Sequence, residues 1–196
     1  MARKANPGNF AFIDSQNLVA SLKKVGWNMD WRKFRLFLDK NYGVSRAYMF
    51  IGYIPEMQDL YEQMHDAGYA VVLKPTFDLT RPRPGEGGRR PNDKPVKGNV
   101  DTDLVLWAMK ELPNYDKAVV VSGDGDYYGL IEYLVDNKRM EKLLVPSLYF
   151  SGLFNRYKEY VERLDQHREE LAYHDKRHSS PPAKPRVPKA KTPVKK

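Results

Sequence analysis

The stretch from Phe10 to Asp14 reads Phe-Ala-Phe-Ile-Asp, and residues 118–126 read Ala-Val-Val-Val-Ser-Gly-Asp-Gly-Asp. Each stretch begins with a continuous apolar run and then reaches carboxylates, which is typical of a buried strand whose C-terminal end opens onto a loop. Similar apolar runs cover residues 44–53, 69–74 and, more weakly, 142–145. The pattern therefore predicts five strands that are buried on both faces.

Helical patterns lie between these strands, over residues 30–40, 55–67, 100–112 and 127–137. Alternating strands and helices, with continuous apolar strands, indicate an α/β fold: a doubly wound parallel sheet flanked by helices on both faces. Residues 150–172 place apolar side chains at helical spacing, so we expect one or two C-terminal helices there. There is no internal repeat.

The composition of the 196-residue chain fits one globular domain with appendages, since 41% of the residues are hydrophobic. There is no apolar run of 18 residues and only a short apolar stretch near the start, so we expect neither a membrane span nor a signal peptide. The absence of cysteine excludes disulfides, a thiol nucleophile and cysteine-ligated zinc, and it permits a reducing, cytoplasmic location.

The net charge of +8 comes entirely from the C-terminal tail. Residues 176–196 hold eight lysines and arginines and no acid, which leaves 25 basic and 25 acidic residues in the rest of the chain. With five prolines and no aromatic residue, residues 175–196 are expected to form a disordered basic tail. Such a tail attracts an anionic partner, RNA above all, or merely keeps the protein soluble.

The long segment over residues 75–99 is also basic and holds five prolines and four glycines. Loops of this length inside a domain are usually functional or disordered. It leads from a strand to the next helix, so we expect it to lie beside the carboxyl end of that strand and to contact RNA, although a tolerated surface insertion has the same composition. The predicted RNA-binding side chains are Arg81, Arg83, Arg89, Arg90, Lys94 and Lys97.

Aspartates from three distant parts of the chain follow predicted strands or open a helix at the same edge of the sheet. They are Asp14, Asp101, Asp103, Asp124 and Asp126. Ligands of open α/β sheets bind outside the carboxyl ends of the strands, where the strand order reverses. Each aspartate also has a local explanation as a helix cap, a dipole partner or a turn residue. Their coincidence at one edge favours a site.

Clustered carboxylates repel one another, and a hard divalent cation relieves that repulsion. The four histidines lie far from the acids in sequence, so Mg²⁺ or Mn²⁺ is favoured over zinc or iron. Such a cation activates water and stabilises charge on a leaving oxygen, so phosphodiester hydrolysis is the predicted chemistry. There is no glycine-rich phosphate loop and no serine hydrolase motif.

These motifs resemble the NYN domain, in particular its LabA-like branch within the PIN-like nuclease group. The matching pieces are residues 12–17, with Asp14 and Asn17; residues 97–101, ending in Asp101; and residues 119–127 around Asp124. Asn99 is an extra residue in the middle motif, and Asp103 is an additional acid after it. The resemblance implies a PIN-like domain over residues 1–148, and the apolar spacing predicts a C-terminal helical extension over residues 149–174.

The resemblance also implies a Mg²⁺- or Mn²⁺-dependent ribonuclease. Its catalytic, metal-binding residues would be Asp14, Asp101, Asp124 and Asp126. Asn17 would hold the loop of the first acid or touch substrate, and Ser122 would support the site. Helical residues two apart point about 200° from each other, so Asp103 is expected to support the site from behind Asp101.

Two other functions remain open from the sequence. The first is a non-catalytic RNA-binding or regulatory protein on the same scaffold, favoured by the basic segments and the 13 tyrosines. The second is a phosphatase of the haloacid dehalogenase type that uses Asp124 and Asp126, although that pair normally follows the first strand. We expect no membrane partner, and the sequence is compatible with a homo-oligomer.

Overall fold

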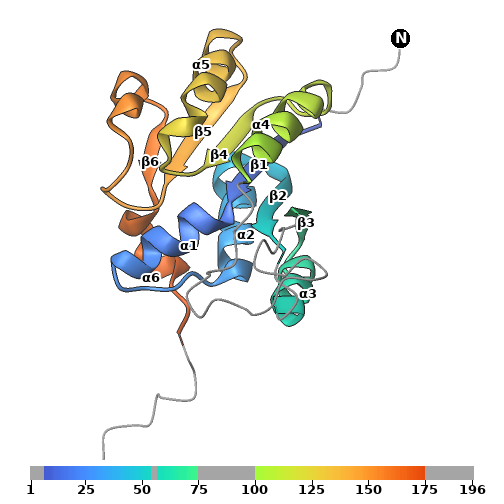
Figure 1. Ribbon diagram of the computed structural model, residues 1–196, viewed down its shortest axis with the longest axis vertical. Coiled ribbons are helices and arrows are strands. Elements are labelled where there is room, and N and C mark those ends of the chain that lie inside the picture. The colour runs from blue at the N-terminus through green and yellow to red at the C-terminus, as the bar shows by residue number, and fades with distance from the viewer. Residues whose placement is uncertain (1–6, 54–56, 75–99, 175–196) are drawn as a thin grey trace, which may run out of the picture.

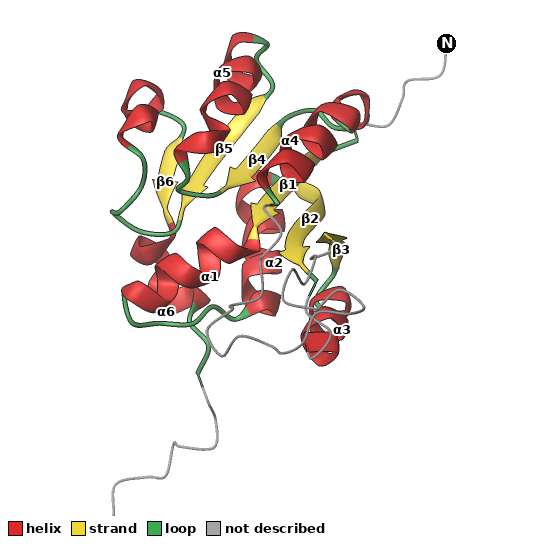
Figure 2. Cartoon of the chain, in the orientation of Figure 1, coloured by secondary structure: helices red, strands yellow, loops and turns green. Residues whose placement is uncertain are grey.

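The computed structural model describes residues 7–53, 57–74 and 100–174, and these residues form an α/β sandwich around one parallel sheet (Figure 1). Six strands lie side by side in the order β3-β2-β1-β4-β5-β6 (Figure 2). The strands are β1 (Asn9–Asp14), β2 (Val44–Gly52), β3 (Tyr69–Lys74), β4 (Ala118–Val121), β5 (Met140–Val145) and β6 (Val161–Arg163). Every neighbouring pair is parallel, which confirms the predicted fold class.

The strand order reverses between β1 and β4. The chain runs outward from β1 through β2 to β3, and then returns to place β4 on the other side of β1. Ile13 at the end of β1 pairs with Val121 at the end of β4. The residues that follow this pair are Asp14 and Ser122. They therefore lie at the topological switch point, where open α/β sheets bind ligands.

Helices cover both faces of the sheet. One face is covered by α1 (Ser15–Lys24), α2 (Trp31–Tyr42), α3 (Gln58–Asp66) and α6 (Arg168–Leu171). The other is covered by α4 (Asp101–Lys110), α5 (Tyr128–Asp136) and the 3₁₀ helix η4 (Gly152–Tyr157). Further short 3₁₀ helices are η2 (Leu112–Asn114), η3 (Gly125–Tyr127) and η5 (Leu164–His167).

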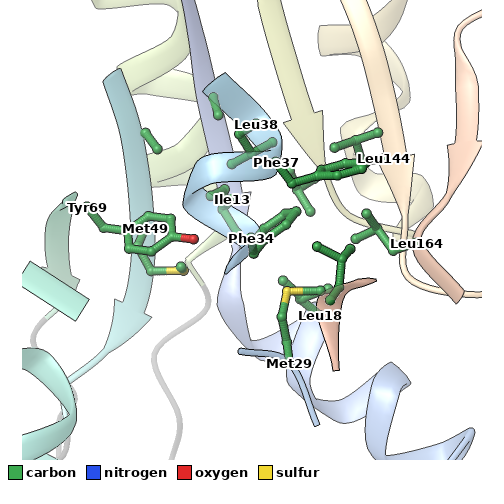
Figure 3. Close-up of a cluster of buried hydrophobic side chains, with 14 of the residues drawn as sticks. Ile13, Leu18, Met29, Phe34, Phe37, Leu38, Met49, Tyr69, Leu144 and Leu164 are labelled. Atoms are coloured by element: carbon green, nitrogen blue, oxygen red, sulfur yellow. The ribbon is translucent and has the colours of Figure 1, made fainter. Parts of the chain in front are cut away.

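The helix α2 shows how local sequence and packing agree. Asp30 caps its first turn by accepting hydrogen bonds from the backbone N–H groups of Arg32 and Lys33. Gly43 ends it in the left-handed conformation, with φ of 61°, which glycine adopts without steric cost. Between these ends, Phe34, Phe37 and Leu38 point into the core against the sheet (Figure 3). Burial of this apolar face stabilises the helix on the sheet.

The predicted helices over residues 150–172 are found only in part. The segment holds η4, then strand β6, then η5 and the short α6. Apolar residues such as Leu153, Tyr157 and Leu164 have the spacing of a helix, but backbone pairing with β5 at Leu143↔Val161 keeps the three residues of β6 extended. Residues 161–163 therefore complete the same sheet instead of forming a separate helical extension.

Two predicted segments, residues 75–99 and 175–196, lie outside the described residues. In the part of the chain that the structure describes, no helix is both long enough and apolar enough to span a bilayer.

Candidate active site at the switch point

Asp14 lies at the centre of the site. It is the last residue of β1 and the N-cap of α1, at the switch point. Its side chain is 3% exposed. Oδ1 accepts a hydrogen bond from the backbone N–H of Asn17 at 3.0 Å, so the carboxylate caps α1. The Ser122 hydroxyl lies 3.4 Å from Oδ2. The capping explanation is therefore correct for Asp14, but it uses only one of the two carboxylate oxygens.

Tyr127 brings Asp14 together with Asp101, which opens α4. Its hydroxyl oxygen lies 2.6 Å from Asp101 Oδ1 and 3.2 Å from Asp14 Oδ2. The tyrosine side chain is fully buried. A phenol carries one hydrogen, so it donates to one carboxylate at a time. The fully buried hydroxyl thus lies between two carboxylates, of which Asp14 is buried and Asp101 is half-buried.

Burial sets the ionisation of this group. Desolvation raises the pKa of Asp14 above its ordinary value of 3.8, and the charge of Asp101 raises it further, against the hydrogen bonds from Asn17, Tyr127 and Ser122. Desolvation and the neighbouring charge of Asp14 also raise the pKa of Tyr127, which therefore stays a neutral hydrogen-bond donor. An ionised Asp14 is costly here without a positive partner.

A pH-dependent stability difference follows from the raised pKa of Asp14. The folded state keeps the Asp14 proton at pH values where the unfolded chain has lost it, so stability is lost as the pH rises through the folded pKa. Without divalent metal, Asp14→Asn is expected to be more stable than wild type at pH 7 by about 1 kcal/mol, because the amide removes the buried charge.

Urea unfolding in chelator at several pH values measures this difference. The two proteins should converge as the pH falls below 3.8, where the carboxyl becomes protonated in both states. A wild type that gains stability over the variant between pH 4 and 7 would show that the folded protein favours the ionised form of Asp14.

The segment Ser122–Asp126 forms a tight turn beside Asp14. The Asn17 side-chain oxygen accepts a hydrogen bond from the Gly123 N–H at 2.9 Å, which ties α1 to this turn. The Ser122 hydroxyl accepts from the Asp124 N–H at 3.1 Å. Asp124 Oδ1 in turn accepts from the Asp126 N–H at 3.1 Å and caps η3. Asn17 and Ser122 therefore position the turn.

The turn leaves Asp124 half-buried and Asp126 exposed to solvent. Asp103 lies elsewhere: it forms an ion pair with Lys74 at the end of β3, with 3.1 Å between the charged atoms. Asp101 and Asp103 thus have different partners, as expected from their angular separation on α4.

The structure does not gather the four predicted metal ligands into one set. Among the residues that the structure describes, no three acidic or histidine side chains are close enough to hold an ion together. It does bring Asp14 and Asp101 to one hydroxyl, with Asp124 on the adjoining turn. The predicted RNA-binding residues fall outside the described residues: they are Arg81, Arg83, Arg89, Arg90, Lys94 and Lys97.

The role of Tyr127 was missed from the sequence, where it stood only as the last residue of the third motif. A tyrosine whose ring is buried usually gives its hydroxyl a partner. Its position directly after Asp126 was the available signal. The carboxylates that contact the Tyr127 hydroxyl belong to β1 and α4, which are distant in the chain. The local sequence around Tyr127 therefore does not predict them.

The protein is therefore an α/β domain with a parallel sheet and an acidic site, built around Asp14 and Asp101, at the carboxyl edge of that sheet. The chain belongs to the NYN domain family, whose sequence profile matches residues 10–162. The match reaches into β6, so the family domain includes the sixth strand of the sheet.

Two further similarities support the family and the fold. The chain is 27% identical over 128 residues to the low amplitude and bright protein LabA of Synechococcus elongatus, across 63% of this chain and 65% of LabA. The crystal structure of a protein of unknown function from Vibrio parahaemolyticus superposes with a TM-score of 0.63 at 20% identity, across 88% of this chain and all of that one. At that identity the second similarity shows the fold alone.

Proposed function

We propose that the protein is a metal-dependent ribonuclease that hydrolyses phosphodiester bonds at the carboxyl edge of its sheet. One observation carries the proposal: Asp14 and Asp101, 87 positions apart in the chain, contact the same buried hydroxyl at the switch point. Isolated helix caps would not require this convergence. Membership of the NYN family, which resembles the PIN-like nucleases, supports the same assignment.

The residues present fit Mg²⁺ or Mn²⁺. Mg²⁺ is usually bound through one or two carboxylates, and water and substrate phosphate supply its remaining ligands. Asp14 and Asp101 provide two carboxylates that contact the same hydroxyl, and a cation there would offset the desolvation and charge repulsion that raise the pKa of Asp14. When bound, the cation would activate water for attack on phosphorus and stabilise the leaving oxygen.

The protein's own groups prepare this edge for a phosphodiester. Asn17 and Ser122 hold the turn that carries Asp124 against the end of β1. Tyr127, a neutral donor, keeps Asp14 and Asp101 at fixed positions. Because these groups lie on rigid strand and helix ends, little reorganisation is needed when substrate arrives.

Cleavage of labelled single-stranded RNA tests the proposal. We expect Mn²⁺ to raise the cleavage rate by about tenfold or more over a chelated sample, and EDTA to abolish it reversibly. Asp124→Asn should lose the metal-stimulated cleavage as well. Asp136→Asn provides the control, since Asp136 is an exposed aspartate at the C-terminal end of α5.

Two outcomes contradict the proposal. Robust cleavage by Asp124→Asn would remove that residue from the chemistry. RNA binding that survives chelation, with no turnover on several RNAs, would instead support the non-catalytic RNA-binding function on the same scaffold. Turnover of a generic phosphate monoester without RNA cleavage would indicate a phosphatase.

A further inference from the structure

Three exposed apolar side chains lie on the segment that follows β5. Leu148 is 52% exposed, Tyr149 is 69% exposed and Leu153 is 56% exposed. We call these three residues the Tyr149 rim. Large apolar side chains that are exposed next to one another mark an interaction site more often than scattered ones do.

The Tyr149 rim is attached to the acidic turn of the candidate site. The Ser151 N–H donates a hydrogen bond to the Gly123 carbonyl at 2.9 Å. A side chain built on Gly123 would lie 3.3 Å from Phe150 Cβ, and one on Gly125 would lie 3.2 Å from Leu153 Cδ1. The absence of a side chain at both glycines allows this close approach. In Figure 1 the loop after β5 lies at the sheet edge where β4 and β5 end.

A guanidinium group stands on the same surface. Leu153 and Arg156 are three residues apart on η4, and on a 3₁₀ helix such residues lie one above the other. The Arg156 side chain is 72% exposed, with Nη1 3.7 Å from the Glu132 carboxylate and 3.3 Å from the Tyr128 hydroxyl. An ion pair this exposed is weak, so Arg156 can exchange it for a phosphate at little cost.

These features fit an unpaired nucleotide better than a second protein copy. Exposed aromatic rings stack on unpaired bases, and arginine binds the phosphates between them. A stable protein interface uses about 20–30 residues on each side, which three apolar side chains and one arginine do not supply. Bases within a duplex are already stacked on one another and are not available to Tyr149.

We propose that the Tyr149 rim binds single-stranded RNA beside the acidic site, with one base stacked on Tyr149 and an adjacent phosphate held by Arg156. The inference rests on the proposed function, because the site at the switch point supplies the reason for RNA to reach this edge. Beyond the proposed function, it specifies that the bound RNA is single-stranded and that Tyr149 and Arg156 select it.

Binding measured without catalysis tests the inference. The probe is a fluorescein-labelled 12-nucleotide RNA without secondary structure, titrated with the full-length protein in EDTA and followed by fluorescence anisotropy. We expect Tyr149→Ala to weaken binding roughly tenfold, the usual effect of removing one stacking side chain. Tyr149→Phe should bind like wild type, because stacking needs the ring and not the hydroxyl. Tyr133→Ala is the matched control, since Tyr133 is a part-exposed tyrosine on the outer surface of α5.

A second variant reports stacking directly. Because the protein already has three tryptophans, the signal is the difference from wild type: Tyr149→Trp should show additional quenching by the single-stranded RNA and much less by a hairpin duplex. Unchanged affinity in Tyr149→Ala, no RNA binding by wild type, or a change of oligomeric state in Tyr149→Ala without loss of RNA affinity would each overturn the inference. Tyr149-dependent binding without metal-stimulated cleavage would overturn the proposed nuclease function alone, and cleavage with Tyr149-independent binding would overturn the inference alone.

Discussion

Asp14→Asn is expected to lower the rate of metal-stimulated RNA cleavage roughly 100- to 1,000-fold, the usual cost of removing one group that stabilises charge in a closed site. The carboxylate lies at the switch point, is almost fully buried and shares the Tyr127 hydroxyl with Asp101. Asparagine has nearly the same shape, and its oxygen can still accept the Asn17 N–H that begins α1. The substitution therefore removes charge while keeping the local fold. The measurement is kcat/KM for a labelled RNA at saturating Mn²⁺.

The controls separate loss of chemistry from loss of structure. Asp136→Asn makes the same chemical change at an exposed position at the end of α5 and should cleave like wild type. Far-ultraviolet circular dichroism should show an unchanged fold for both variants. If Asp14→Asn keeps more than about a tenth of the wild-type kcat/KM, Asp14 acts only as a helix cap and the site must be assigned elsewhere.

The sheet could be predicted from the sequence because its strands are continuous apolar runs. Five such runs became β1 to β5 with small changes at their ends, and the aspartate and serine after two of them mark the carboxyl edge. The sixth strand could not be predicted. Its three residues are only partly buried, and their extended conformation depends on pairing with β5 rather than on their own pattern.

The sequence predicts only those site residues whose position follows from the topology of the sheet. Asp14 follows β1 directly, so any parallel sheet places it at the ligand-binding edge. Other contacts depend on side-chain packing between distant elements: Asp101 reaches Tyr127, and Asp103 reaches Lys74. The spacing of these two acids on a helix predicted that they face different directions, but it did not predict the partner of either. Their separate partners come from the helix's rotation on the sheet.

β1 joins the fold to the site, and Phe12 lies in the middle of this strand. It is fully buried against the α4 and α5 face of the sheet. Its ring stacks on Tyr48 of β2, with centroids 5.6 Å apart, and meets Tyr115 edge-on at 5.5 Å. Such aromatic pairs add stability beyond the buried area alone. The strand that ends in Asp14 is therefore held in place by ring contacts with Tyr48 and Tyr115.

Phe12→Ala is expected to lower the free energy of unfolding by about 3–5 kcal/mol, since alanine leaves a cavity that the two neighbouring rings cannot fill. For a chain of this size that loss corresponds to a melting temperature roughly 10 °C lower. Urea unfolding and differential scanning calorimetry without metal measure both quantities. Leu106→Ala, at a leucine exposed on α4, should change the free energy by less than about 0.5 kcal/mol. A Phe12→Ala effect as small as that of Leu106→Ala would mean that the aromatic cluster is loose and that α4, rather than β1, holds the acidic edge in place.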